Sequence, residues 1–532
     1  MKFTRKIISI ILALATVFPT LALAGCNNSG SKEPMVDDVD HNNRTFYQIF
    51  VGSFSDSDGD GIGDLRGIIN RMDYLNDGDV NNGNDLGIQG IWLSPILTSP
   101  SYHKYDVKNY YEVDPEFGTM DDLKELIALC HERNVKVIID LVINHTSSQN
   151  QWFMEFKDAR TNGKTDSPYY DYYTCVTLDE KESGKTYQNI GMSDFWYECN
   201  FSGAMPELNF DNPEVRELTL EIAKFYLDMG IDGFRFDAVK YIYFGDAKRS
   251  VDFWKWYMGE LQAYKPDIYC VGECWSGENE ILEYYEALNC FNFGIGGAEG
   301  VVARTAKGSD VSVFTSYVER YQDVVQEANS NGVPISFLSN HDQDRIAGTF
   351  IDQNYMKMAA SLYLLSPGSP FIYYGEEIGI KGSRGSASTD ANRRLAMLWG
   401  DGDTIKNPVG SNYKDSRQID TTVKSQLEDD KSMLNHYTAL IAIRNRYDAI
   451  SCGDYNAVTH ESTSFGGFYV EYKDEILGIF HNTGAEDLVI DLSECEGLDG
   501  HSFSSLLESL GGKARLKGTT LKIPAYTSVI LK

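Results

Sequence analysis

Short apolar runs alternate with amphipathic segments along most of the chain. Apolar runs of about four to eight residues indicate buried strands, and apolar positions that recur every three or four residues indicate helices. Helical segments include 65–77, 120–134, 212–230 and 432–450. Strand runs cover 45–54, 87–97, 135–145, 231–239, 267–275, 333–342 and 370–380. This alternation predicts parallel strands joined by crossover helices.

The alternation is interrupted once and ends near residue 450. Residues 146–208 are polar and aromatic without clear periodicity, which predicts an inserted domain after the third strand. Residues 451–532 return to alternating strands, which predicts a small antiparallel β domain. We interpret the remainder, 43–145 and 209–450, as an α/β fold, a (β/α)8 TIM barrel. A doubly wound sheet is the alternative, but no Gly-rich dinucleotide turn follows the first strand.

The N-terminus has the layout of an export signal. Basic residues precede an apolar run, and small residues follow it up to Cys26. The ending "LAGC" resembles a bacterial lipobox, in which the cysteine becomes the lipidated first residue. We expect a signal peptide over 1–25, a lipid anchor on Cys26 and a flexible tether over 26–42. The protein would then be an exported cell-surface lipoprotein, and a signal without lipidation is the alternative.

The net charge of -31 opposes partners that are held by phosphate contacts. We therefore expect no nucleic-acid partner and no membrane contact except through the anchor. We also expect a monomer. The 33 tyrosines and 26 phenylalanines suit stacking on carbohydrate, although aromatic residues are also ordinary core material.

The chain has nine cysteines, of which Cys26 is one. Export permits disulfides, and the pairs to consider are Cys175 with Cys199 and Cys452 with Cys495. Buried free thiols are the open alternative.

Polar residues gather at the carboxyl ends of the predicted strands, where barrel active sites are built. Singly, such an acid often caps a helix and such a histidine often lies in a core. Several acids at one rim, without a metal-binding H-E-x-x-H or a nucleophile elbow, favour glycoside hydrolysis. The polar residues at these strand ends are Asp140, Asn144, His145, Arg235, Asp237, Glu273, His341 and Asp342.

The stretch "GFRFDAVK" predicts which of these side chains point inward. In a strand, alternate residues face opposite sides. Phe234 and Phe236 therefore share an apolar face, and Arg235 shares the other face with Asp237.

Four segments, "DLVINH", "GFRFDAVK", "VGECW" and "FLSNHD", resemble in this order the signature segments of the α-amylase family of glycoside hydrolases, family thirteen. "MPELN", at 205–209, resembles the fifth segment, in the form of the group between oligo-1,6-glucosidases and neopullulanases. The resemblance runs from about residue 42 to the C-terminus. It implies retaining endo-hydrolysis of α-1,4-glucosidic bonds in starch and maltooligosaccharides.

Two alternatives stay open. One is an enzyme of the α-glucosidase or neopullulanase type that trims or transglycosylates oligosaccharides. The other is a starch-binding lipoprotein without catalysis, which the intact set of acids argues against.

The resemblance also implies roles. Asp237 would be the nucleophile, Glu273 the general acid and base, and Asp342 the acid that binds sugar hydroxyls and stabilises the transition state. Arg235 would keep Asp237 ionised and oriented. Glu273 would need a raised pKa, which less polar surroundings such as Trp275 could provide. The further substrate-binding residues would be His103, Tyr105, His145, Lys240 and His341.

The loop "DSDGDGIGD" follows the first predicted strand and has the ligand spacing of an EF-hand loop without its final glutamate. It resembles the calcium loop of oligo-1,6-glucosidases, and we expect structural Ca²⁺ there. The expected ligands are the carboxylates of Asp56, Asp58, Asp60 and Asp64 and the carbonyl of Ile62.

A second calcium site of the family is in question. It usually accompanies a histidine after the lysine of "DAVK", where this chain has Tyr241, although Asn144 remains as a possible ligand.

Overall fold

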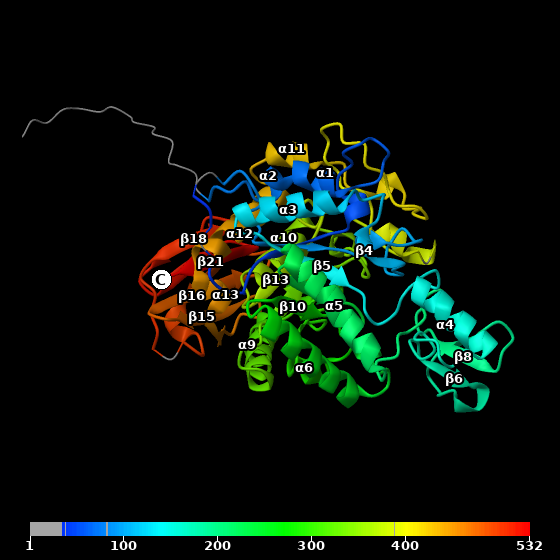
Figure 1. The fold of residues 1–532 in the computed structure, drawn as a ribbon. Helices are drawn as coiled ribbons and strands as arrows, with labels where there is room; N and C mark the ends of the chain where they lie inside the picture. The colour runs from blue at the N-terminus through cyan, green and yellow to red at the C-terminus, as the bar shows by residue number, and fades with distance from the viewer. Residues whose placement is uncertain (1–34, 38, 81–82, 388, 499) are drawn as a thin grey trace, which may run out of the picture.

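The computed structural model describes residues 35–37, 39–80, 83–387, 389–498 and 500–532. The predicted signal peptide and Cys26 lie outside the described residues. Figure 1 shows a central barrel, a projecting segment that carries α4, β6 and β8, and a C-terminal β region.

Eight parallel strands form the barrel. Their order is β11-β10-β9-β5-β2-β1-β13-β12, and a bridge between Phe291 and Ile335 joins the two outermost strands. The (β/α)8 prediction is confirmed. Only β11 lies outside the strand runs, because two residues are too few to show a hydrophobic pattern. The strands are β1 (Phe46–Ile49), β2 (Gly90–Leu93), β5 (Lys136–Leu141), β9 (Gly233–Phe236), β10 (Tyr269–Gly272), β11 (Asn289–Cys290), β12 (Ile335–Phe337) and β13 (Ser369–Tyr373).

Helices surround the barrel, and local signals set their ends. Thr119 and Asp122 form a capping box at the start of α3. Asn212 caps α5, Pro213 opens it, and Gly230 ends it with a φ of 111°. The segment predicted as one helix over 65–77 forms α1 and α2. The barrel helices are α1 (Leu65–Asn70), α2 (Met72–Leu75), α3 (Met120–Glu132), α5 (Pro213–Met229), α6 (Ala247–Tyr264), α7 (Glu278–Tyr285), α8 (Val301–Ala306), α9 (Val311–Ala328), α10 (Gln353–Leu364), α11 (Val423–Leu427), α12 (Met433–Arg446) and α13 (Asp448–Cys452).

The side chains of β9 alternate as the sequence predicts. The ring of Phe236 lies 4.7 Å from that of Trp254 on α6. Arg235 points the opposite way, into the barrel, with its guanidinium 5.3 Å from the ring of Trp92. Since the period is two, Asp237 follows on the inner face.

A small sheet and a helix lie between β5 and α5. The strands β6 (Cys175–Thr177), β8 (Phe195–Glu198) and β7 (Tyr187–Asn189) form an antiparallel sheet in that order. The sheet packs on α4 (Gln151–Asn162), where the rings of Phe153 and Tyr197 lie 4.9 Å apart. A further strand pair, β3 (Leu97–Thr98) and β4 (Asn109–Val113), follows β2.

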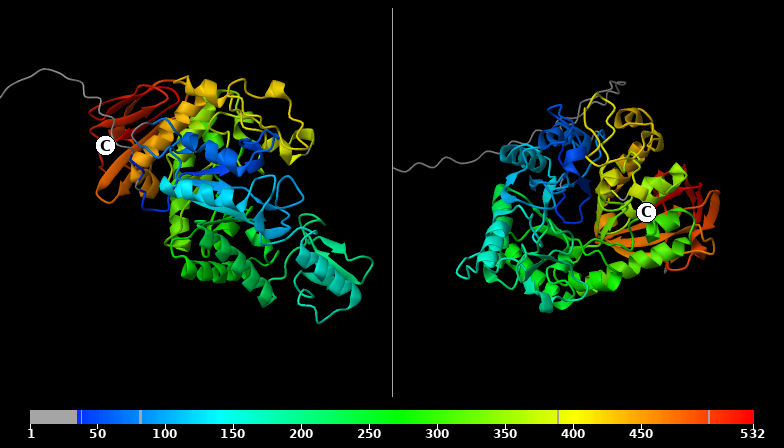
Figure 2. Two further views of the ribbon diagram at one scale, coloured as in Figure 1. Left: turned by 45° about the horizontal axis from the view of Figure 1, so that its top comes forward. Right: turned by 90° about the vertical axis from the view of Figure 1, so that its right-hand side faces the viewer.

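The C-terminal part is antiparallel β structure, as predicted. A five-stranded sheet has the order β14-β15-β16-β21-β18, and a three-stranded sheet has the order β17-β20-β19. Figure 2 shows these strands and the β6-β8-β7 sheet on opposite sides of the barrel. The strands are β14 (Asp454–Thr459), β15 (Phe465–Tyr472), β16 (Glu475–Asn482), β17 (Leu488–Asp491), β18 (Leu506–Leu510), β19 (Arg515–Lys517), β20 (Thr520–Ile523) and β21 (Thr527–Leu531).

The described end of the predicted tether contacts the barrel. The side chain of Gln89 donates to the Asp37 carboxylate at 2.8 Å, and that of Asn134 donates to the Asp37 carbonyl at 2.7 Å. Arg44 donates to the carbonyl of Val39 at 2.8 Å. Residues 37 and 39–44 are therefore held beside the starts of β2 and β5, which differs from the flexible tether expected up to residue 42.

The eight cysteines of the described residues are free. The structure therefore forms neither the pair Cys175 with Cys199 nor the pair Cys452 with Cys495, and it agrees with the free-thiol alternative. Among the described residues, no helix combines the length and the apolar character needed to cross a bilayer.

Candidate active site

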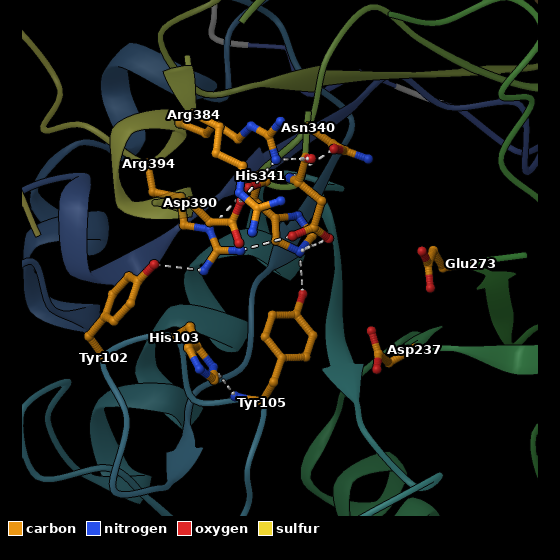
Figure 3. Close-up of polar contacts among 12 residues, drawn as sticks. Tyr102, His103, Tyr105, Asp237, Glu273, Asn340, His341, Arg384, Asp390 and Arg394 are labelled. Atoms are coloured by element: carbon orange, nitrogen blue, oxygen red, sulfur yellow. Dashed lines mark hydrogen bonds and ion pairs between the residues drawn. The ribbon is translucent and has the colours of Figure 1, made fainter. Parts of the chain in front are cut away.

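Asp237 and Glu273 follow neighbouring strands at matching positions. Phe236 of β9 is in register with Gly272 of β10, and each acid comes directly after one of these residues. Neighbouring strands lie about 4.8 Å apart. Figure 3 shows the two carboxyl groups close together, across from Tyr105 and His341.

One buried guanidinium joins these acids to a third. Arg235, whose side chain is 1% exposed, donates to Asp237 Oδ1 at 2.7 Å and to Asp140 Oδ1 at 2.6 Å. It also lies 3.7 Å from Glu273. The predicted contact between Arg235 and Asp237 is present, and such charge-assisted bonds orient a carboxylate.

The surroundings of Glu273 favour its protonated form. Burial raises its pKa to about 8, an effect that Arg235 opposes and the neighbouring Asp237 charge reinforces. Glu273 therefore carries a proton at neutral pH. Trp275 contributes less than expected, because it is 45% exposed and stacks on Phe293.

Asp342 follows β12 and is held by two partners. Arg394 donates to its Oδ1 at 2.9 Å, and the Nε2 of His341 lies 3.0 Å from its Oδ2. Although burial opposes ionisation, His341 and Arg394 hold the pKa of Asp342 well below its usual range. Asp342 is therefore ionised. Arg394 also donates to the hydroxyl of Tyr102 at 3.1 Å (Figure 3).

Four of the predicted substrate-binding residues lie around these acids. The ring of Tyr105 stacks on that of His341 with centroids 5.5 Å apart, and its hydroxyl lies 2.5 Å from the His341 Nε2. The Nε2 of buried His145 has no hydrogen-bond partner among the described residues. The Nδ1 of His103 accepts from the backbone N–H of Tyr105 at 3.1 Å. Burial lowers the pKa of His103 to about 4, so it is neutral.

Lys240 lies on the Trp275 side of the site. Its Nζ donates to the carbonyl of Trp275 at 2.7 Å, so it links the loop after β9 to the loop after β10.

The predicted calcium loop gathers three carboxylates. Asp56, Asp58 and Asp64 each place an oxygen within 4.8 Å of the others. Asp60 lies outside this group, and its Oδ1 accepts from the backbone N–H of Ile62 at 2.7 Å. Crowded carboxylate oxygens repel one another and are the donors that Ca²⁺ prefers, so the three residues fit a calcium ion.

No comparable group surrounds Asn144 in the part of the chain that the structure describes. The Asn144 side chain instead lies 3.3 Å from the Nδ1 of His145.

Sequence reasoning missed several residues of the site. Asp140 lies at a predicted strand end, but its sequence position does not indicate that it accepts a hydrogen bond from Arg235. Gln48 lies within an apolar run, and its amide is 2.7 Å from the Nδ1 of His341. That polar residue inside the run was the available signal. Arg394 lies far beyond the predicted motifs, and no local pattern marked it.

The family profile described as "Alpha amylase, catalytic domain" matches residues 48–453. The chain belongs to the α-amylase family. It is 39% identical over 455 residues to "Alpha-amylase 3" of Dictyoglomus thermophilum, a match that covers 83% of this chain and 85% of that protein. It is 30% identical to "Oligo-1,6-glucosidase" of Bacillus cereus over 84% of this chain and 91% of the relative.

The solved structures agree with this membership. "Eubacterium rectale Amy13B" superposes with a TM-score of 0.85 at 32% identity, covering 94% of this chain and 97% of that structure. This α-amylase family protein is therefore a glycoside hydrolase on a (β/α)8 barrel.

Proposed function

We propose that this family member is an endo-acting hydrolase of α-1,4-glucosidic bonds in starch and maltooligosaccharides, and that it retains anomeric configuration. The observation that carries the retaining mechanism is the matching position of Asp237 and Glu273 on neighbouring strands. Retaining glycosidases have their two carboxyl groups about 5 to 5.5 Å apart, which adjacent strands can provide.

The two acids divide the chemistry. Asp237, oriented by Arg235, attacks the anomeric carbon while protonated Glu273 gives its proton to the departing glycosidic oxygen. The resulting Glu273 carboxylate then takes a proton from water, whose oxygen displaces Asp237 from the covalent glycosyl-enzyme.

The surrounding residues bind the sugar at the cleavage point. Ionised Asp342 accepts bonds from sugar hydroxyls, and the unpartnered Nε2 of His145 supplies a polar contact. Tyr105 offers a ring for stacking. His103 and His341 supply further polar contacts. Lys240, beside Trp275, contacts sugar on the leaving-group side.

Relatives named α-amylase support starch as the substrate. A second candidate is trimming or transfer on short oligosaccharides. Relatives named "Oligo-1,6-glucosidase" and "4-alpha-glucanotransferase" favour it.

Three further proposals complete this function. A calcium ion held by Asp56, Asp58 and Asp64 would neutralise the loop and stabilise the fold. Lipidation of Cys26 after export would place the enzyme at the cell surface, supported by the signal and lipobox pattern. The protein would act as a monomer.

The test is the release of reducing ends from soluble starch, with product sizes followed over time. Residues 27–532 are compared with the Asp237→Asn variant, which keeps the shape of the nucleophile but not its charge. We expect mixed oligosaccharides early from the wild type and background release from the variant.

Other results would lead to different conclusions. Glucose or maltose alone from the first time points would favour the trimming alternative. Starch binding without release by either protein would indicate a binding lipoprotein.

A further inference from the structure

Two adjacent carboxyl groups, separated from the end of β13 by two residues, are buried, and the mechanism above does not use them. Glu376 is 1% exposed and Glu377 is 0% exposed. Among the described side chains, hydroxyl groups and no cation donate hydrogen bonds to them, although the charge of buried Arg345 acts on Glu377. A buried acid without a cation is unfavourable unless hydrogen bonds satisfy it. Two in sequence therefore call for a reason in the molecule.

Glu376 collects hydroxyl donors from three parts of the barrel. Its Oε1 accepts from Tyr363 of α10 at 2.8 Å and from Tyr437 of α12 at 3.1 Å. Its Oε2 accepts from Ser339 at 3.1 Å. Ser339 begins the segment 339–342, which ends in Asp342. Glu376 therefore ties the segment that carries Asp342 to two helices.

Glu377 reaches the same segment by another route. Its Oε1 accepts from Tyr47 of β1 at 2.6 Å and from Tyr74 of α2 at 2.7 Å. Gln48, the next residue of β1, points to the opposite face, where its amide lies 2.7 Å from the Nδ1 of His341. Glu377 thus anchors the strand that contacts His341.

We propose that Glu376 and Glu377 are positioning residues, which hold the 339–342 segment from two sides so that His341 and Asp342 stay in place beside Asp237. This inference rests on the proposed function. A shift of about 1 Å in a catalytic group can cost roughly 100-fold in rate, so fixing this segment matters for turnover.

The pKa shifts of the two glutamates agree with a need for these hydroxyl partners. Burial raises the pKa of Glu376 to about 7, against hydrogen bonds from Tyr363, Ser339 and Tyr437 that lower it. Burial also raises the pKa of Glu377. Loss of a hydroxyl partner therefore changes how the carboxyl group is held.

The test compares Glu376→Gln, Ser339→Ala and their double variant with Asp232→Asn. Asp232 is a buried acid that precedes β9, at the opposite end of the barrel from the catalytic acids. We expect Glu376→Gln to lower kcat on a maltooligosaccharide about tenfold or more, with KM within about threefold. The double variant should be no worse than the worse single variant, because the contact that Ser339→Ala removes is one of those that Glu376→Gln alters.

A second readout does not depend on hydrolysis. Hydrogen exchange of a peptide covering 338–343 should quicken in Glu376→Gln, and in Glu377→Gln to a smaller extent, but not in Asp232→Asn. Unchanged kcat and exchange in a folded Glu376→Gln protein would overturn the inference, as would additive effects in the double variant. If the wild type itself releases no reducing ends, the proposed function fails, and the exchange data still decide whether Glu376 holds the segment.

Discussion

Arg235 and Glu273 show how one barrel gives two neighbouring carboxyl groups different surroundings. Arg235 is fully enclosed and gives its shortest contacts to Asp237 and Asp140, while Glu273 lies farther from it at 3.7 Å. Arg235 bonds directly to Asp237. At Glu273 the effect of burial dominates, so this carboxyl group keeps its proton. This division suits an attacking carboxylate beside a proton donor.

The raised pKa of Glu273 predicts an alkaline limit for catalysis. Since the protonated form is the active acid, kcat/KM should fall about tenfold per pH unit above the pKa of about 8. Glu273→Gln cannot donate a proton and should lose roughly 100- to 10,000-fold on starch. It should recover much of the first step on an aryl maltooligoside, whose leaving group needs no proton.

Glu283→Gln is the matched control, because Glu283 is exposed on α7. Its pH profile should equal that of the wild type. An alkaline limit in the wild type far below or above pH 8, or an equal loss in the control, would contradict this assignment.

At the scale of elements, the loop before α1 depends on a segment distant in sequence. The Oδ2 of Asp56 accepts from the hydroxyl of Thr404 at 2.6 Å. Asp403 accepts from Ser55 at 2.6 Å, and Arg71 bridges to Asp403 at 2.9 Å. Residues 403–404 therefore hold the acidic loop by hydrogen bonds. The spacing of the aspartates in the sequence does not indicate these contacts.

Calcium should stabilise this loop through Asp58 and not through Asp60. A ligand present at a hundredfold excess over its Kd adds about 2.7 kcal/mol to the free energy of unfolding. We expect Ca²⁺ to raise Tm in the wild type, EDTA to reverse the rise, and Asp58→Asn to abolish it. The measurement is thermal unfolding with and without each addition.

Asp60→Asn provides the comparison, since the amide oxygen can still accept the Ile62 N–H bond. This variant should keep the calcium response. Equal loss in both variants would return Asp60 to the ligand set, and no response in the wild type would argue against a calcium site.

On the scale of the whole molecule, the first described residues and the catalytic acids lie at opposite ends of the barrel. Asp37 and Arg44 are bonded beside the starts of β2 and β5, through Gln89 and Asn134. The acids lie where β9 and β10 end. An anchor at the N-terminus would therefore join the chain at the end of the barrel opposite the active site.

Cys26→Ala tests the anchor. In the parent cells or a bacterial host, the full chain should fractionate with membranes, and intact cells should digest soluble starch. The variant should appear in soluble form with unchanged kcat. Equal membrane association of both proteins would contradict lipidation at Cys26.

Local patterns predicted most of the fold and the principal acids. The period of two in "GFRFDAVK" placed Arg235 and Asp237 on the inner face, because a pleated strand permits no other arrangement. The same reasoning failed for β11, which is too short for a pattern. Asp60 has the spacing of a loop ligand, and in the structure its Oδ1 accepts from the backbone N–H of Ile62.

Sequence by itself therefore determined the alternation of strands and helices, the family resemblance and the acids at the strand ends. Only the tertiary structure decided which groups tune those acids. Arg235 reaches Asp140 across 95 residues, and Arg394 reaches Asp342 across 52. Such contacts depend on how distant segments pack around the barrel, and neither hydrophobic period nor local spacing encodes that packing.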